Sequence, residues 1–245
     1  MEERPRAILL KFPGTNCDEE TARALETVGF DTKVLPISSL APESLLGVSL
    51  VVLSGGFSYG DYIMAGRLAQ LVTEQRMGET LREFRDKGGY LLGICNGFQI
   101  LTQLSLLPEA SLVKNTSGRF QCRWVTLKNT APESPYLSQM PELFELPIAH
   151  AEGRLVTRTN EEAKKYREKN LAALIYQDDV NGSFEHIAAL QDETGRVFGL
   201  MPHPERFMEK RRHYDPDWTG SENDRGSGYY FFRSLYEAVK AESSS

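Results

Sequence analysis

The pattern of apolar and polar positions alternates short apolar runs with amphipathic stretches in the first half of the chain. The apolar runs predict strands at residues 7–12, 34–37, 50–53 and 90–94. The amphipathic stretches predict helices that begin after Asn16, over 69–87 with a break near Gly78, and over 97–106. Strands that alternate with helices in this way predict an α/β fold with a parallel sheet covered on both sides.

The second half of the chain changes character, because short strands follow one another with few helices between them. Strands are predicted over 120–127, 144–150, 171–176, 187–191 and 197–201. Helices are predicted over 160–170 and 227–241. The turn at 193–196 predicts a hairpin between the last two strands. We expect one domain over 1–245, with a polar surface excursion at 210–226 and a frayed tail at 242–245.

Composition narrows the class of protein. The 245 residues include 28 basic and 34 acidic side chains, which give a formal net charge of −6, and 40% of residues are hydrophobic. These proportions exclude a disordered, collagen-like or disulfide-scaffold chain, and the negative charge argues against a nucleic-acid partner. No apolar run is long enough for a membrane helix or a signal peptide. Three widely spaced cysteines suit a reducing compartment, so we expect a cytoplasmic protein.

The strongest local signal lies where the apolar run 90–94 meets the next helix. Cys95 stands at this junction, with Gly93 two residues before it and Gly97 two residues after it. Such a pair of glycines permits the tight turn of a nucleophile elbow, which exposes the sulfur at a helix N-terminus that favours the thiolate. The backbone N–H of Asn96 would then serve as one oxyanion donor. The alternative is an inert buried cysteine. Cys17 lacks such a glycine pair and Cys122 lies inside a predicted strand, so we expect both to be structural.

A thiolate mechanism also needs a base, and His203 is the best candidate. It follows an apolar strand between two prolines, which hold the backbone extended, and Glu205 lies two residues on. Residues two apart in an extended segment point the same way, so the carboxylate can orient the imidazole. His150 is a second candidate base that could instead line the pocket or bind a backbone carbonyl. His186 and His213 lack such context, and we expect both at the surface.

Adjacent glycines end the buried run 50–53. Gly55 and Gly56 allow a close approach of backbone to a ligand, and we favour a backbone N–H near Gly56 as the second oxyanion donor. A phosphate cradle is the weaker interpretation, because the lysine and spacing of a P-loop are absent. A simple sharp turn is the remaining alternative.

These pieces occur along the chain in the order Gly-Gly, Gly-x-Cys-x-Gly, His-x-Glu, and this order resembles the class I, or triad, glutamine amidotransferases. The resemblance covers nearly the whole chain. It implies a flavodoxin-like open, mostly parallel sheet flanked by helices, with an added antiparallel strand region. It also implies that Cys95 is the nucleophile, His203 the base and Glu205 the orienting carboxylate.

Four longer motifs narrow the resemblance to one branch, the glutaminase subunits of phosphoribosylformylglycinamidine synthase. They are Pro-Gly-Thr-Asn-Cys-Asp at 13–18, Gly-Gly-Phe-Ser-Tyr-Gly-Asp-Tyr at 55–62, Cys-Asn-Gly-Phe-Gln-Ile-Leu at 95–101 and Pro-His-Pro-Glu-Arg at 202–206. The resemblance implies a glutamine pocket lined by Gly55, Phe57, Gln99 and His150, an oxyanion hole from Gly56 and Asn96, and no metal.

The same resemblance implies the partners. Ammonia released from glutamine would pass to a large synthase subunit, which uses ATP and magnesium to make formylglycinamidine ribonucleotide in purine biosynthesis. A small accessory subunit would complete the complex. The chain has no ATP motif of its own, so we expect it to bind no cofactor.

Three alternatives remain open at this stage. DJ-1/PfpI-like hydrolases and glyoxalases resemble the elbow but lack the late His-x-Glu pair. A non-catalytic subunit could use the same pocket to sense glutamine. A class I glutaminase that serves another synthase would carry the same triad.

Overall fold

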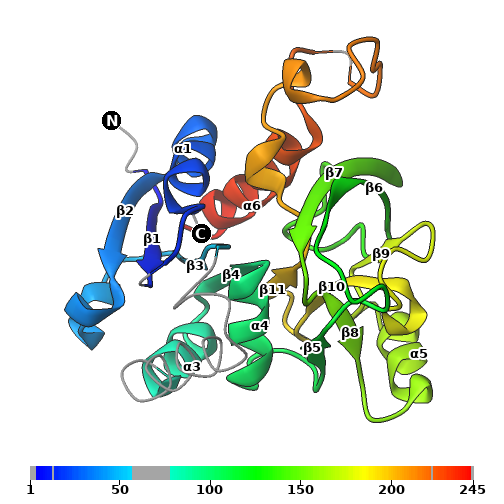
Figure 1. Ribbon diagram of the computed structural model, residues 1–245. Helices are drawn as coiled ribbons and strands as arrows, with labels where there is room; N and C mark the ends of the chain where they lie inside the picture. The colour runs from blue at the N-terminus through cyan, green and yellow to red at the C-terminus, as the bar shows by residue number, and fades with distance from the viewer. Residues whose placement is uncertain (1–3, 13, 57–77, 222, 244–245) are drawn as a thin grey trace.

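The computed structural model describes residues 4–12, 14–56, 78–221 and 223–243. A nine-stranded sheet runs through the molecule in the order β2-β1-β3-β4-β11-β10-β9-β6-β7 (Figure 1). Its strands are β1 (Arg6–Lys11), β2 (Asp31–Pro36), β3 (Leu50–Leu53), β4 (Tyr90–Ile94), β6 (Gln121–Asn129), β7 (Leu143–His150), β9 (Leu174–Tyr176), β10 (Ile187–Gln191) and β11 (Val197–Leu200). The described helices are α1 (Asp18–Val28), α3 (Glu79–Asp86), α4 (Asn96–Gln103), α5 (Asn160–Glu168) and α6 (Ser227–Ser243).

The sheet has a parallel part and an antiparallel part. Strands β2, β1, β3, β4 and β11 pair in parallel, whereas β11, β10, β9, β6 and β7 pair antiparallel. This arrangement confirms the predicted α/β class with an added antiparallel region, and it confirms the hairpin between β10 and β11. A separate two-stranded sheet of β5 (Ser111–Val113) and β8 (Arg154–Val156) was not predicted, because three residues are too few to show an alternation.

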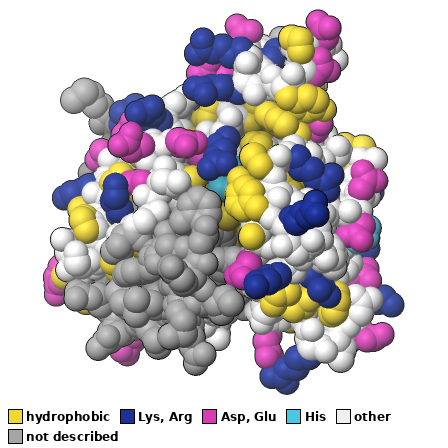
Figure 2. Space-filling model, viewed as in Figure 1, with side chains coloured by type: hydrophobic (Ala, Val, Ile, Leu, Met, Phe, Trp, Pro, Cys, Tyr) yellow, Lys and Arg dark blue, Asp and Glu magenta, His cyan; other side chains and the backbone are white. Residues whose placement is uncertain are grey.

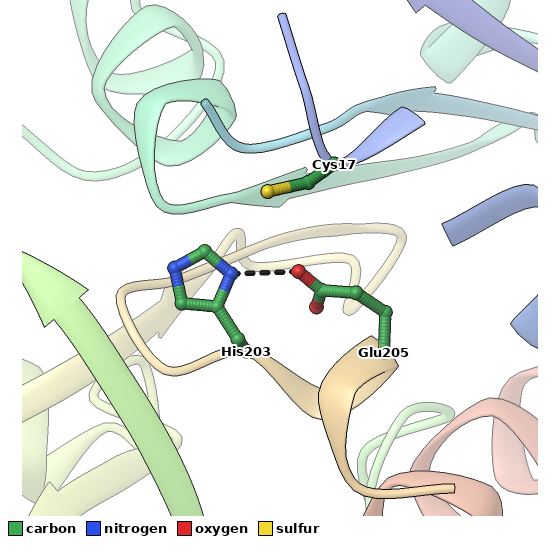
Figure 3. A group of neighbouring side chains, drawn as sticks. All are labelled: Cys17, His203 and Glu205. Atoms are coloured by element: carbon green, nitrogen blue, oxygen red, sulfur yellow. Dashed lines mark hydrogen bonds and ion pairs between the residues drawn. The ribbon is translucent and has the colours of Figure 1, made fainter. Parts of the chain in front are cut away.

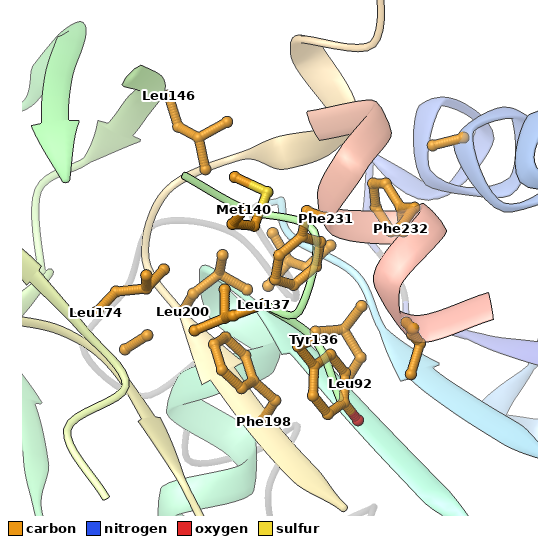
Figure 4. Close-up of a cluster of buried hydrophobic side chains, with 14 of the residues drawn as sticks. Leu92, Tyr136, Leu137, Met140, Leu146, Leu174, Phe198, Leu200, Phe231 and Phe232 are labelled. Atoms are coloured by element: carbon orange, nitrogen blue, oxygen red, sulfur yellow. The ribbon is translucent and has the colours of Figure 1, made fainter. Parts of the chain in front are cut away.

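Alternate residues of the central strands point to opposite faces of the sheet, and each face has its own apolar core. Leu9, Val52 and Leu92 pack with α1 and α6 on one face, where Phe231 and Phe232 are fully buried (Figure 4). Their immediate neighbours in the strands pack on the other face against α3 and α4. The helices on both faces explain why the strand over 50–53 is apolar throughout.

The register of the parallel strands decides where the candidate side chains can meet. Leu53 pairs with Gly93, and Ile94 pairs with Leu200, so β3, β4 and β11 end at the same edge of the sheet. The loop after β1 leaves from this edge too, because Leu10 pairs with Leu53. Segments that are far apart in the sequence are therefore joined at the carboxyl ends of four neighbouring parallel strands, where open α/β sheets place their ligand sites.

Several predicted element ends are wrong. The strand expected at 34–37 spans 31–36, the one expected at 171–176 begins at Leu174, and the helix expected over 97–106 ends at Gln103. Of the helix expected over 69–87, residues 69–77 lie outside the described part of the chain. Helix α1 begins at Asp18 with Cys17 as its N-cap residue, not Asn16, whose Oδ1 instead accepts a hydrogen bond from the Cys17 sulfur. At the other end of the chain, α6 continues through Ser243, although the tail was expected from residue 242. The reason is a contact that the sequence pattern does not show: Glu242 accepts hydrogen bonds from Tyr90 and Arg196, which attach the last helical turn to the sheet.

The segment 210–226 stands out from the body of the molecule, as its polar sequence predicts (Figure 1, orange). Its base is nevertheless packed, since the rings of Trp218 and His213 stack with centroids 5.0 Å apart and Phe207 lies edge-on to Trp218. His213 is buried and its Nε2 lies 3.2 Å from a Glu145 carboxylate oxygen, so the expected surface position of His213 is wrong.

Part of the surface near this excursion is apolar. Figure 2 shows hydrophobic side chains over the excursion and along the strands beneath it, and Tyr214 of the excursion is 64% exposed. Among the described helices, none has both the length and the apolar character to cross a membrane.

Candidate active site

Cys95 occupies a strained turn between β4 and α4. Its φ of 52° and ψ of −106° lie in a region that non-glycine residues rarely adopt, at a typical cost of about 1–3 kcal/mol. The turn is held because the backbone N–H of Cys95 donates to the Leu200 carbonyl at 2.7 Å, which continues the β4–β11 pairing. This conformation is the nucleophile elbow that the sequence predicts, and the observed strain supports a functional reason for it.

The two glycines that flank Cys95 are needed for steric reasons. A Cβ added to Gly97 would lie 1.9 Å from the Leu53 carbonyl oxygen, and one added to Gly93 would lie 2.6 Å from the Gly97 carbonyl oxygen. Both obstacles are backbone atoms that cannot move aside. The glycines therefore let α4 approach β3 and β4 closely enough to form the elbow.

His203 and Glu205 form a buried pair next to β11. His203 Nδ1 donates to Glu205 Oε1 at 2.6 Å, and the side chains are 2% and 0% exposed. The segment is not extended as predicted, because Pro204–Arg206 forms a single 3-10 turn. The pairing of the two residues is nevertheless as expected, since the turn folds the carboxylate back onto the ring.

The pairing with Glu205 favours the protonated form of the His203 ring. Burial by itself lowers the pKa of His203, but the Glu205 charge and contacts with the Cys17 and Cys95 thiols raise that pKa well above its ordinary value. Since Nδ1 donates to Glu205, Nε2 is the ring nitrogen that remains for chemistry. Nε2 is buried and has no hydrogen-bond partner among the described residues.

Gly55 places the thiol and the imidazole together. A Cβ added to Gly55 would lie 3.0 Å from His203 Cε1 and 3.3 Å from Cys95 Cβ. The two side chains thus face each other across the end of β3, and a larger residue at position 55 would push between them. The structure therefore brings the predicted nucleophile, base and orienting carboxylate into one cluster.

The Cys95 sulfur is bordered on another side by the end of β7. Its Sγ lies 3.9 Å from the Ala149 carbonyl oxygen, and His150 follows as the last residue of β7. His150 is buried, and burial followed by repulsion from His203 lowers its pKa to about 4. Asn115 Oδ1 lies 3.1 Å from His150 Nδ1 and also accepts from the Gly153 N–H. His150 therefore donates through Nδ1, and its Nε2 is a buried acceptor without a partner in the described part of the chain.

Asn96 and Gln99 lie on the first turn of α4. The backbone N–H of Asn96 has no acceptor within the helix, because it belongs to the first turn. The Asn96 side-chain amide donates to Gln99 Oε1 at 3.0 Å, and Gln99 Nε2 donates to the Glu152 carbonyl at 2.6 Å. Gln99 thus attaches the elbow helix to the turn that directly follows His150.

Gly56 lies beside the loop after β1. It has a φ of 129°, it bridges to Thr15, and a Cβ added to it would lie 2.6 Å from Asn16 Oδ1. Phe57, which the family resemblance places in the pocket, lies outside the described residues. The donor role expected for Gly56 stays a prediction.

Cys17 is a neighbour of the site that the sequence pattern did not reveal. Its sulfur, one nitrogen of His203 and one oxygen of Glu205 all lie within 4.8 Å of one another, and the sulfur points toward the gap between the ring and the carboxylate (Figure 3). Arg206 Nη2 donates to this sulfur at 3.2 Å. The one signal in the sequence was the position of Cys17 after β1, because all parallel strands end at the same edge.

A sulfur, an imidazole and a carboxylate are also a donor set for a soft metal ion. The geometry fits a hydrogen bond better, because 2.6 Å between His203 Nδ1 and Glu205 Oε1 is too short for an ion to lie between them. The guanidinium of Arg206 beside the sulfur also repels a cation. The expectation of a metal-free site stays a prediction.

Comparison with known proteins agrees with this geometry. The model of the CobB/CobQ-like glutamine amidotransferase domain matches residues 4–238. The chain belongs to this family. It is therefore a glutamine amidotransferase.

Individual relatives cover most of the chain. The phosphoribosylformylglycinamidine synthase subunit PurQ of Dehalococcoides mccartyi is 34% identical over 93% of this chain and 94% of its own length. PurQ of Thermotoga maritima is 39% identical over 84% and 90%. A chain in the solved structure of PurLQS from Thermotoga maritima has a TM-score of 0.79 and 34% identity, and the match covers 97% of this amidotransferase and 100% of that chain.

Proposed function

We propose that this amidotransferase is the glutaminase subunit of a phosphoribosylformylglycinamidine synthase and that it hydrolyses glutamine through a thioester on Cys95. The observation that carries the proposal is the elbow thiol of Cys95 facing the buried His203–Glu205 pair across Gly55. The PurQ relatives, at 34–39% identity over most of the chain, indicate which synthase the glutaminase serves.

The chemistry follows from the positions of the three groups. The Cys95 thiolate attacks the side-chain amide carbon of glutamine and forms a tetrahedral intermediate. His203, oriented by Glu205, gives its Nε2 proton to the leaving nitrogen, and ammonia departs as the thioester forms. His203 then takes a proton from water, which attacks the thioester and releases glutamate and Cys95. The buried Glu205 charge stabilises the imidazolium at both steps.

Backbone donors would stabilise the negative oxygen of each intermediate. The N–H of Asn96 at the start of α4 is one donor, and an N–H near Gly56 at the end of β3 is the second. A single donor of this kind typically contributes about 3–4 kcal/mol to lowering the barrier.

We place the rest of the glutamine in the space bordered by Gly55, Gln99 and His150. His150 Nε2 supports this placement, because a buried acceptor that no described residue binds suits a substrate N–H donor. Gln99 acts by holding the turn that directly follows His150, since both ends of its amide are already hydrogen-bonded.

Ammonia would be consumed by a partner subunit. We propose a large synthase subunit that binds ATP and magnesium, together with a small accessory subunit, in the cytoplasm. The related PurLQS structure from Thermotoga maritima supports an assembly of this kind. This chain supplies no cofactor in the proposal, because ATP activates the other substrate on the synthase.

The test uses the complete complex with either glutamine or an ammonium salt as nitrogen donor. We expect Cys95→Ala to abolish glutamine-dependent formation of formylglycinamidine ribonucleotide and to leave the ammonia-dependent rate within about two-fold. Cys122→Ala, at an exposed cysteine of β6, is the matched control and should change neither rate. Glutamine hydrolysis that survives in Cys95→Ala would overturn the proposal, and so would a synthase that makes a different product.

A further inference from the structure

Cys17 is an unusual residue for its local position. It is the N-cap residue of α1, where serine, threonine, aspartate and asparagine are favoured because their side chains accept backbone N–H bonds of the first turn. The Cys17 side chain makes no such bond. The Thr21 hydroxyl and N–H instead bind the Cys17 backbone carbonyl at 2.7 and 3.0 Å. The helix start therefore gives no reason for a thiol at this position.

The Cys17 side chain is directed at the His203–Glu205 pair instead. Its sulfur is buried, donates to Asn16 Oδ1 at 3.4 Å and accepts from Arg206 Nη2 at 3.2 Å. Arg206 is held in turn by Glu20, whose carboxylate lies 3.6 Å from Arg206 Nε. The sulfur also lies within 4.8 Å of one ring nitrogen of His203 and of one carboxylate oxygen of Glu205.

We propose that Cys17 is a positioning residue of the glutaminase, which holds the His203 ring against Glu205 and stabilises the ring when it carries a proton. The proposal rests on the proposed function, because it assigns Cys17 a role through His203. Glu205 has one oxygen, Oε2, that is buried without a partner among the described residues, so the carboxylate by itself does not fix the pair in one orientation. The Cys17 sulfur, which comes from the β1–α1 loop, and Arg206 together fix the orientation of the His203–Glu205 pair.

The inference predicts a specific kinetic pattern for Cys17→Ala. In the complete complex, kcat for glutamine hydrolysis should fall about ten-fold, because a base displaced by a fraction of an ångström transfers protons less efficiently. KM should stay within about two-fold, since Cys17 does not border the glutamine pocket. Cys17→Ser, which keeps a donor and acceptor at the position, should recover part of kcat.

The pH dependence separates positioning from a purely structural role. Glu205, Cys17, Cys95 and His150 are the titratable groups that face His203, and Arg206 faces Cys17. The Cys17 contact raises the pKa of His203, so its removal lets the imidazolium lose its proton at lower pH. The measurement is the rate at which iodoacetamide alkylates Cys95 as a function of pH, followed on the Cys95 peptide by mass spectrometry. The alkaline limb of this rate profile should move to lower pH in Cys17→Ala.

Controls make the outcome decisive. Cys122→Ala removes an exposed thiol and should keep the wild-type kcat and alkylation profile. A Cys17→Ala protein with wild-type kcat and an unshifted alkaline limb of the alkylation rate would overturn the positioning role. If Cys17→Ala is too unstable to assay, the same two measurements on Cys17→Ser decide whether Cys17 positions His203. Cys95→Ala, assayed in parallel, distinguishes the two proposals: if Cys95→Ala is inactive and Cys17→Ala is normal, only the role of Cys17 fails.

Discussion

The pKa values of two buried histidines in one site are shifted in opposite directions. The carboxylate of Glu205 raises the pKa of His203, whereas burial next to that charged ring lowers the pKa of His150 to about 4. Burial lowers the pKa of both rings, but only His203 has a compensating charge, because its Nδ1 donates to a carboxylate whereas His150 faces the neutral amide oxygen of Asn115. Neighbouring titratable groups with separated pKa values are typical of acid–base sites.

The low pKa of His150 predicts a loss of stability in acid. The folded state binds this proton only near pH 4, whereas the unfolded chain binds it near pH 6.5, so protonation favours unfolding as the pH falls through that interval. We expect His150→Gln, whose amide can still donate to Asn115 Oδ1, to lose about 2 kcal/mol less stability than wild type between pH 7 and pH 5. Urea unfolding at both pH values measures this difference.

The exposed His186 provides the control for that measurement. His186→Gln should follow the wild-type stability at both pH values. An equal acid-induced loss in wild type and His150→Gln would show that His150 is not kept neutral by the fold.

At the scale of elements, the elbow depends on how closely α4 approaches the sheet. The glycine at position 97 permits backbone contact with β3, and the strained φ of Cys95 is compensated by the bond to the Leu200 carbonyl. Strand pairing and helix packing thus hold a backbone conformation that the cysteine itself disfavours.

Gly97→Ala should therefore disrupt the elbow. Its Cβ would meet the Leu53 carbonyl oxygen at 1.9 Å, so β3 and α4 must separate, and we expect a loss of about 3 kcal/mol in urea unfolding. Gly118→Ala is a matched control, because its Cβ would meet nothing within 4 Å and only its φ of 62° causes strain, at about 1 kcal/mol. Equal losses in the two variants would contradict the steric explanation.

At the scale of the whole molecule, the excursion at 210–226 is connected to the catalytic strand end. Trp218 packs edge-on to Phe207, which directly follows the turn that carries Glu205 and Arg206. Phe207 also packs against Trp124 of β6, with ring centroids 4.8 Å apart. One aromatic cluster therefore joins the excursion, the antiparallel part of the sheet and the His203–Glu205 turn.

We expect Trp218→Ala to lower both stability and turnover. Removal of a half-buried indole should cost about 2 kcal/mol in urea unfolding, and the loosened turn should lower kcat several-fold with little change in KM. Tyr214→Ala, at a neighbouring ring that is 64% exposed, should cost less than about 1 kcal/mol and leave kcat unchanged. A Trp218→Ala protein with wild-type kcat would show that the excursion is not coupled to the site.

The sequence by itself determined the class of fold, the elbow and the identity of the main candidates. Cys95 and His203 were found because each ends an apolar run, and parallel strands place such ends at one edge. Glu205 was found by its spacing from His203, although the turn that joins them was predicted as extended. The strands over 50–53, 90–94 and 187–191 have the bounds that their apolar patterns predicted.

Only the tertiary structure decided which other side chains share the site and in what state. Cys17 meets Arg206 across 189 positions of sequence, and Asn115 meets His150 from a separate turn, so no local pattern contains either contact. The same holds for the burial of His213 and for Glu242 at the end of α6. Local patterns report periodicity and turns, whereas burial, hydrogen-bond partners and pKa depend on segments that only the packed sheet brings together.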